Sequence, residues 1–168
     1  IGIARAGNVI GGGDWSDYRL LPDCIKAWTK NKKVKIRNPN STRPWQHVLD
    51  VLNGYIMLGA KLNKNKKLHG EAFNFGPSNS KNLRVLDILK ISKSIWPEIN
   101  WIIENKKNFF ENNLLQLNSN KAKKILNWKC NLSSKDSIQM TIDWYKNYVL
   151  KRNVYNLSRK QILDFKER

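Results

Sequence analysis

The first fifteen residues hold the densest cluster of groups that could meet a ligand. A short run of apolar and small residues, 3–6, leads into a loop that contains Gly7, Asn8, Gly11, Gly12, Gly13 and Asp14. Glycine lets the backbone approach a ligand closely, so that amides and the Asn8 carboxamide can point at phosphate or sugar oxygens. The pattern predicts a strand that ends in a ligand-binding loop.

The spacing of Gly7, Gly11 and Gly13 also matches a dinucleotide-binding turn. A true fingerprint opens a helix directly and is followed about twenty residues later by an acidic residue at the end of the next strand. Here the loop continues through 14–17 before any helix, and the next strand ends at Arg37. We therefore favour a site for another phosphate or sugar ligand over a pyrophosphate turn inside this chain.

A second cluster, residues 43–47, comes directly before a helix. Arg43 stands beside Pro44 and Trp45, which restrict its motion and can present its guanidinium as a fork to a phosphate. The alternative is a surface arginine stacked on Trp45. His47 could act as a base, but no nucleophile is near it in the sequence, so a hydrogen-bonded structural histidine is favoured.

Motifs of classical catalysis are absent from the sequence. It contains no G-x-S-x-G, H-E-x-x-H or paired C-x-x-C, and none of its tyrosines has a lysine four positions later. We therefore assign no catalytic residue and no metal site. Cys24 and Cys130 stand alone and are expected to be reduced, packed thiols.

The net charge of +18 suggests a polyanion as partner. The cations are mostly lysines spread along the chain, without the arginine forks and regular aromatics of phosphate readers, which favours a solvated surface. A nucleic-acid-binding module remains the alternative. No apolar stretch approaches eighteen residues and no signal peptide is visible, so we expect a cytoplasmic protein without a membrane partner.

The periodicity of apolar residues predicts alternating strands and helices. We expect strands at 3–6, 34–37, 71–75 and 100–104, helices at 21–31, 48–62, 83–95, 119–126 and 133–152, and a terminal helix or frayed end at 153–168. In the helix at 48–62, the packed face should contain Leu49, Leu52, Ile56 and Gly59. This order indicates an α/β fold whose early strands join a sheet begun before residue 1.

Seven segments occur in an order that resembles one branch of a known superfamily. They are ARAGNVIGGGDW, RLLPDCIKAW, VKIRNP, RPWQHVLDVLNGY, FNFGP, KAKKILNWK and TIDWYK. Together they resemble the CDP-glucose 4,6-dehydratases, in the nucleotide-sugar branch of the extended short-chain dehydrogenases/reductases. The resemblance implies an NAD(P)-binding Rossmann fold. Residues 1–152 would supply its last sheet strands and a small mixed α/β substrate-binding region, with a terminal helix or tail at 153–168 and the NAD-binding half upstream.

The resemblance implies a lyase that converts CDP-glucose to CDP-4-dehydro-6-deoxyglucose with NAD, in surface polysaccharide (O-antigen) biosynthesis. The full-length enzyme would be a homo-oligomer without a nucleic-acid partner, and this chain alone would be inactive because its catalytic groups lie upstream. The alternatives are another NAD-dependent sugar-nucleotide epimerase or dehydratase, or the nucleic-acid-binding module.

The resemblance also assigns site residues. Asn8 and Arg43 would contact the substrate near its diphosphate, and Val9 would lie beside the nicotinamide. Arg19 and Leu20 would belong to the segment that closes over the sugar nucleotide. The remaining expected contacts are with the nucleotide, from Lys35, Ile36, Arg37 and Asn82.

Overall fold

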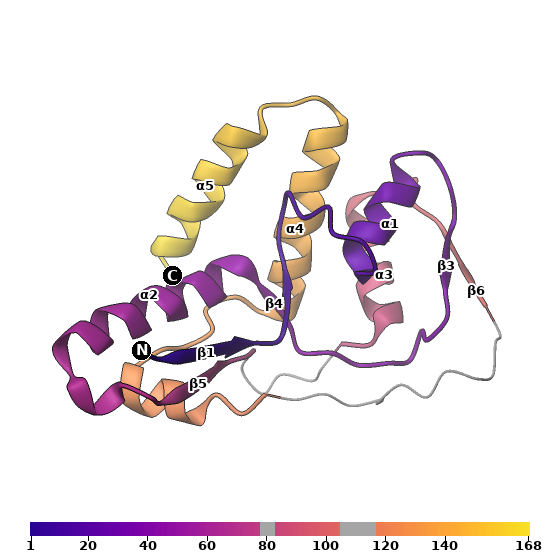
Figure 1. Cartoon of the computed structure of the whole chain (residues 1–168). Coiled ribbons are helices and arrows are strands. Elements are labelled where there is room, and N and C mark those ends of the chain that lie inside the picture. The colour runs from indigo at the N-terminus through magenta and orange to yellow at the C-terminus, as the bar shows by residue number, and fades with distance from the viewer. Residues whose placement is uncertain (78–82, 105–116) are drawn as a thin grey trace.

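A computed structural model describes residues 1–77, 83–104 and 117–168. The strands in these ranges are β1 (Ile3–Ala6), β2 (Asn8–Ile10), β3 (Val34–Ile36), β4 (Trp45–His47), β5 (Ala72–Phe75) and β6 (Trp101–Ile103). The helices are α1 (Leu20–Trp28), α2 (Val48–Lys64), α3 (Val85–Ile95), α4 (Ser134–Val149) and α5 (Val154–Lys166), with a 3₁₀ turn η1 (Lys66–Leu68) and a π-helical turn η2 (Ala122–Leu126). Figure 1 shows their arrangement.

In the described ranges the strands form three parallel pairs, β1 with β5, β2 with β4, and β3 with β6. Parallel strands cannot be joined by a tight hairpin, so each pair brings together segments that lie far apart in the sequence. The α/β class predicted from the sequence is confirmed.

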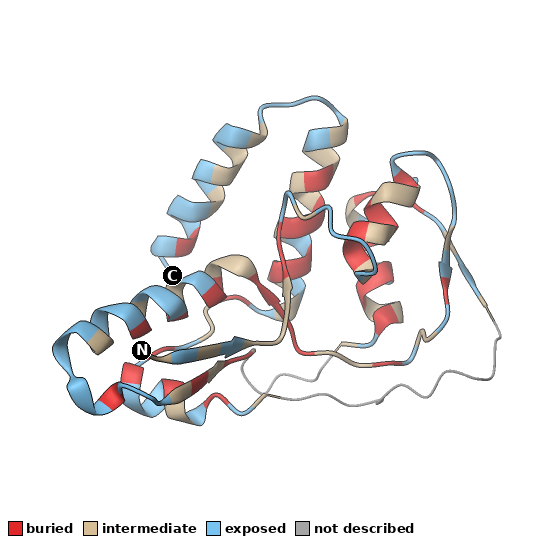
Figure 2. Cartoon of the chain, in the orientation of Figure 1, coloured by how far each residue is buried: buried red, intermediate tan, exposed pale blue. Residues whose placement is uncertain are grey.

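Two apolar cores hold these elements together. The large core lies among α1, α3 and α4 and includes Ile25, Ile88 and Ile142, all fully buried. The small core lies between α2, β5 and η2 and includes Phe75 and Trp128, whose rings meet edge to face at 5.2 Å. Figure 2 shows buried residues on α1, α3 and α4 facing one another, while β1 alternates between exposed and intermediate residues.

The face that α2 buries differs from the predicted one. Leu52 and Ile56 are 47% and 71% exposed, Leu49 is half-buried, and a Cβ added at Gly59 would meet no atom within 4 Å. The prediction of a packed face through Leu49, Leu52, Ile56 and Gly59 was therefore wrong. The buried residues of α2 are Asp50, Val51, Gly54 and Leu58.

Two contacts made outside the helix explain this rotation. The Asp50 carboxylate accepts hydrogen bonds from the backbone amides of Asn131 (2.7 Å) and Leu132 (3.2 Å), which stabilises a buried acid that sequence alone places on the surface. Gly54 faces Phe75, where a Cβ would lie 2.4 Å from the ring. Tertiary contacts, and not the spacing of leucines, choose the buried face.

The other differences are local. Strands β2 and β4 fall within segments predicted to be a loop and a cluster before a helix, and residues 122–126 form a π-helical turn. The C-terminal residues form α5, which packs on α4 through a hydrogen bond from Trp144 Nε1 to Ser158 Oγ (2.9 Å). Within the described ranges, no helix has the length and apolar character needed to cross a membrane.

Candidate functional site

A cavity of about 540 Å³ lies between β2, β3, β4, α1 and α4. Its volume is in the range typical of small-molecule sites. The sequence-predicted site residues that line it are Asn8, Val9, Arg19, Leu20, Lys35, Ile36, Arg37 and Arg43. Asn82, the remaining predicted contact, lies outside the described residues. The fold thus gathers four separate sequence segments into one pocket.

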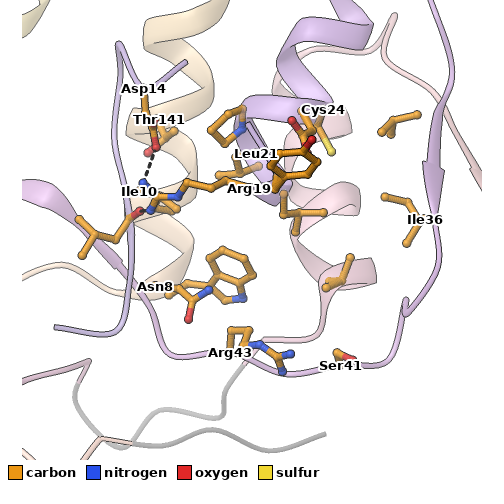
Figure 3. Close-up of a pocket in the computed structure, with 18 of the residues that line it drawn as sticks. Asn8, Ile10, Asp14, Arg19, Leu21, Cys24, Ile36, Ser41, Arg43 and Thr141 are labelled. Carbon is orange, nitrogen blue, oxygen red and sulfur yellow. Dashed lines mark hydrogen bonds and ion pairs between the residues drawn. The ribbon is translucent and has the colours of Figure 1, made fainter. Parts of the chain in front are cut away.

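The pairing of β2 with β4 forms one polar end of this pocket. Asn8 stands opposite Trp45 in the parallel register, which brings the β2 loop beside the segment that carries Arg43. Arg43 donates from NH1 to the carbonyl of Thr42 (2.8 Å), a contact that restricts its guanidinium. Figure 3 shows Asn8 and Arg43 at the same end of the pocket. A carboxamide and a guanidinium together can donate several hydrogen bonds to a phosphate.

Arg19 reaches from the start of α1 toward β2 (Figure 3). Its NH2 donates to the carbonyl of Val9 (2.8 Å), and its NH1 lies 2.9 Å from the Asp14 carboxylate. Burial tends to raise the pKa of Asp14, but hydrogen bonds from Ser16 and the charge of Arg19 hold it below its ordinary value. The Arg19 side chain is 45% exposed, and ion pairs in contact with solvent contribute at most about 1 kcal/mol. An incoming anion can therefore draw Arg19 away from Asp14.

The glycines of the 11–19 loop make room for side chains of the chain itself. A Cβ at Gly12 would lie 2.2 Å from the Trp144 ring, and one at Gly11 would lie 2.7 Å from Val48. The prediction that these glycines allow a ligand to approach the backbone was therefore wrong for Gly11 and Gly12, because side chains of the chain itself fill that space. With this space filled, Gly11 and Gly12 do not form a pyrophosphate cradle.

The wall contributed by α4 was missed from the sequence. Thr141 and Tyr145 line the pocket and are almost fully buried. The Tyr145 hydroxyl donates to the carbonyl of Asp14 (2.6 Å), and burial raises its pKa to about 12, so it stays a donor at neutral pH. The helical spacing of Ile138, Ile142 and Tyr145 marks the buried face of α4, but it does not reveal that this face meets a cavity.

Strand β3 presents a backbone edge to the site. The Val34 amide donates to the Asn100 carbonyl (3.3 Å) and the Glu104 amide donates to the Ile36 carbonyl (2.9 Å). Because backbone groups alternate along a strand, the amide and carbonyl of Lys35 point away from β6. The Lys35 side chain is 70% exposed and lies 3.4 Å from the Glu104 carboxylate. The backbone of Lys35, more than its ammonium group, is therefore placed to meet a ligand.

The two titratable groups most suggestive of catalysis are structural. His47 is 2% exposed, its Nδ1 accepts from the Leu49 amide (3.3 Å), and burial lowers its pKa to about 4. Cys24 is fully buried and its thiol pKa is raised to about 12, mainly by burial. A histidine that caps a helix and a thiol that stays protonated fit the structural roles favoured from the sequence.

No family model matches the chain. CDP-glucose 4,6-dehydratase from Salmonella typhimurium (strain LT2) is 34% identical over 168 residues, which cover 98% of this chain and 47% of that protein. The chain thus spans about half the length of this curated relative.

Two solved structures share the fold. UDP-glucuronic acid 4-epimerase from Bacillus cereus, in complex with UDP-glucuronic acid and NAD, has a TM-score of 0.71 at 22% identity, covering 87% of this chain and 45% of that one. dTDP-glucose 4,6-dehydratase from Bacillus anthracis, in complex with NAD, has a TM-score of 0.63 at 18% identity, covering 87% and 44%. The chain is therefore a sequence relative of CDP-glucose 4,6-dehydratase, and it shares its α/β fold with somewhat under half the length of each of these two solved structures.

Proposed function

We propose that this chain is the nucleotide-sugar-binding half of an NAD-dependent CDP-glucose 4,6-dehydratase. The observation that carries the proposal is the convergence of all eight described site residues on one cavity of about 540 Å³. A surface that binds nucleic acid through diffuse charge needs no such convergence. The relative from Salmonella supports cytidine as the base.

Each group of residues binds a different part of the substrate. Asn8 and Arg43 bind the diphosphate at the polar end of the pocket, where a guanidinium fork matches two phosphate oxygens. The backbone of Lys35 offers one donor and one acceptor to the edge of a pyrimidine. When the segment that includes Leu20 closes over the sugar nucleotide, Arg19 leaves its ion pair with Asp14 and binds the substrate instead.

The chain contributes orientation more than proton transfer. Fixing the diphosphate and the base holds the glucose in one position, and such positioning can supply a large part of a rate enhancement. When bound, NAD would supply removal and return of hydride, and Val9 would lie beside its nicotinamide. Residues 1–152 would form this substrate-binding unit, and α5 would complete it as a terminal helix.

Calorimetric titration of the chain with CDP-glucose, UDP-glucose and dTDP-glucose tests the proposal. We expect CDP-glucose to bind at least tenfold more tightly than the other two. Equal binding of all three would favour a related epimerase or dehydratase with another substrate. Binding to none of them, together with salt-sensitive binding to DNA or RNA, would overturn the proposal in favour of the nucleic-acid-binding module.

A further inference from the structure

Tyr18 has an unfavourable backbone conformation and almost no contact with the rest of the chain. Its φ is +61°, in the left-handed region that bulky side chains rarely adopt, and it is 99% exposed. It also lines the pocket. A strained residue persists only when its surroundings hold it in place, and such residues concentrate at ligand clamps. The positive φ, the exposure and the position at the pocket together indicate a functional role for Tyr18.

The residues around Tyr18 are held on both sides. Arg19 contacts Asp14 and the Val9 carbonyl, and Asp17 forms an ion pair with Lys26. Earlier in the loop, the Asp14 carboxylate accepts from the Ser16 amide (3.0 Å). The backbone of the loop is thus anchored, while the Tyr18 ring at its tip remains in solvent.

Aromatic packing anchors the same loop to α4. The Trp15 ring lies 5.3 Å, centroid to centroid, from both Tyr145 and Tyr148, and the Trp144 ring stacks on Tyr148 at 5.6 Å. Trp144 also occupies the space beside Gly12. These contacts fix where the loop tip stands relative to the pocket, so Tyr18 is presented at the mouth on a preformed support.

The position of Tyr18 along the pocket indicates which part of a bound nucleotide it would contact. The diphosphate end lies at Asn8 and Arg43, whereas Tyr18 comes two residues before the start of α1. Helix α1 packs against β3, whose backbone edge at Lys35 suits a base. An exposed phenol ring can stack on a nucleobase because every base has a π-face.

We propose that Tyr18 is a base-stacking residue that covers the pyrimidine of the bound nucleotide at the mouth of the pocket. This inference rests on the proposed function, because it needs a nucleotide in the pocket. It extends that function by assigning an aromatic contact to the base, in addition to the polar contacts from the backbone of Lys35. The contact made on binding offsets the conformational cost of the positive φ.

Three substitutions separate the ring from the backbone strain. Tyr18→Phe keeps the ring, Tyr18→Ala removes it and keeps the strain, and Tyr18→Gly removes both. Tyr155→Ala is the matched control, since Tyr155 is 69% exposed on α5 and does not line the pocket. Each variant is titrated calorimetrically with cytidine diphosphate and with inorganic pyrophosphate, and its melting temperature is measured.

We expect Tyr18→Ala and Tyr18→Gly to weaken binding of cytidine diphosphate about tenfold. Tyr18→Phe and Tyr155→Ala should bind it within about twofold of the wild type, and pyrophosphate affinity should not change in any variant. Tyr18→Gly should melt at a higher temperature than the wild type although it binds less tightly, because glycine relieves the strain. A purely structural role for Tyr18 cannot produce that combination.

Wild-type affinity of Tyr18→Gly for cytidine diphosphate would overturn this inference and leave the proposed function standing. An equal loss of pyrophosphate affinity would also overturn it, since Tyr18 would then act by positioning the loop. A wild-type chain that binds pyrophosphate but not cytidine diphosphate would instead contradict the proposed function, and the stacking contact with it.

Discussion

The hydroxyl of Tyr145 donates a hydrogen bond of 2.6 Å to the backbone carbonyl of Asp14, 131 positions earlier in the chain. This contact joins α4 to the loop that carries Asp14, Tyr18 and Arg19 at one side of the pocket. The loop is therefore ordered by α4, although nothing in its own sequence indicates such a support.

Tyr145→Phe should loosen this loop. The variant keeps the ring that packs on Trp15 but leaves the Asp14 carbonyl without its donor, so we expect a loss of about 1 kcal/mol in the free energy of unfolding. Hydrogen exchange should become faster at residues 14–19. Tyr155→Phe, at an exposed position on α5, is the control. Unchanged stability and exchange in Tyr145→Phe would show that the bond does not order the loop.

Stability should fall in mild acid because of His47. Its pKa is about 4 in the folded chain, against an ordinary value of 6.5, so between these values the unfolded state binds the proton and the folded state does not. The contribution of neutral His47 to the free energy of unfolding is therefore fully present above about pH 6.5. It is lost as the pH falls toward 4, by about 3 kcal/mol in total.

His47→Asn tests this dependence, because asparagine can still accept from the Leu49 amide as a helix cap but does not titrate. Urea denaturation between pH 4 and 8 should show a flatter profile than that of the wild type. The raised pKa of buried Asp50 acts in the opposite direction in both proteins and cancels in their difference. Parallel profiles for the two proteins would contradict the burial of a neutral His47.

The exposed apolar residues of β1 and α2 should be covered in a longer protein. Ile3 and Ile56 are 50% and 71% exposed, and β1 has one partner strand in the described ranges. Exposed strand edges and apolar faces favour self-association. Light scattering by the isolated chain should rise with its concentration. Coexpression with the N-terminal half of the Salmonella relative should suppress that rise, whereas a monomeric isolated chain would argue against a shared sheet.

The chain alone should not turn over substrate. It has no tyrosine followed four residues later by lysine. Burial keeps His47 neutral and the Cys24 thiol protonated, which fits structural roles for both. With CDP-glucose and NAD, a spectroscopic assay for the 4-keto sugar should remain at background. Turnover by the isolated chain would mean that a catalytic group lies within these 168 residues.

Local patterns predicted the regular elements well. Strands β1 and β5 and helices α1, α3 and α4 lie within a few residues of their predicted ranges, because the periodicity of apolar residues is a property of each segment by itself. Strands β2 and β4 escaped prediction because the glycines that flank β2 indicate a loop and Pro44 directly precedes β4, so neither segment has the isolated apolar alternation of a strand. In the fold, Gln46 of β4 donates from Nε2 to the Phe75 carbonyl of β5 (2.7 Å).

The motifs that carry the resemblance pointed to residues that line the pocket, such as Asn8 and Arg43, and the binding roles of these residues stay predictions. Pocket-lining residues could not be predicted where their position depends on the packing of distant elements. Tyr145 reaches the pocket because α4 crosses behind the 11–19 loop, and Tyr18 attracts attention through a backbone angle and an exposure that no sequence pattern encodes.

Calorimetric titration of CDP-glucose into the wild type, Arg43→Ala, Arg43→Lys and Lys64→Ala tests the central claim most directly. Hydrogen bonds from a charged donor contribute about 1.5 to 3 kcal/mol, so Arg43→Ala should weaken binding by about ten- to a hundredfold. Arg43→Lys should recover only part of this, because an ammonium cannot reproduce the two-pronged contact. Exposed Lys64, at the end of α2 and away from the pocket, should be replaceable without effect. If Lys64→Ala weakens binding as much as Arg43→Ala, the diffuse positive charge binds the ligand and the assigned site is wrong.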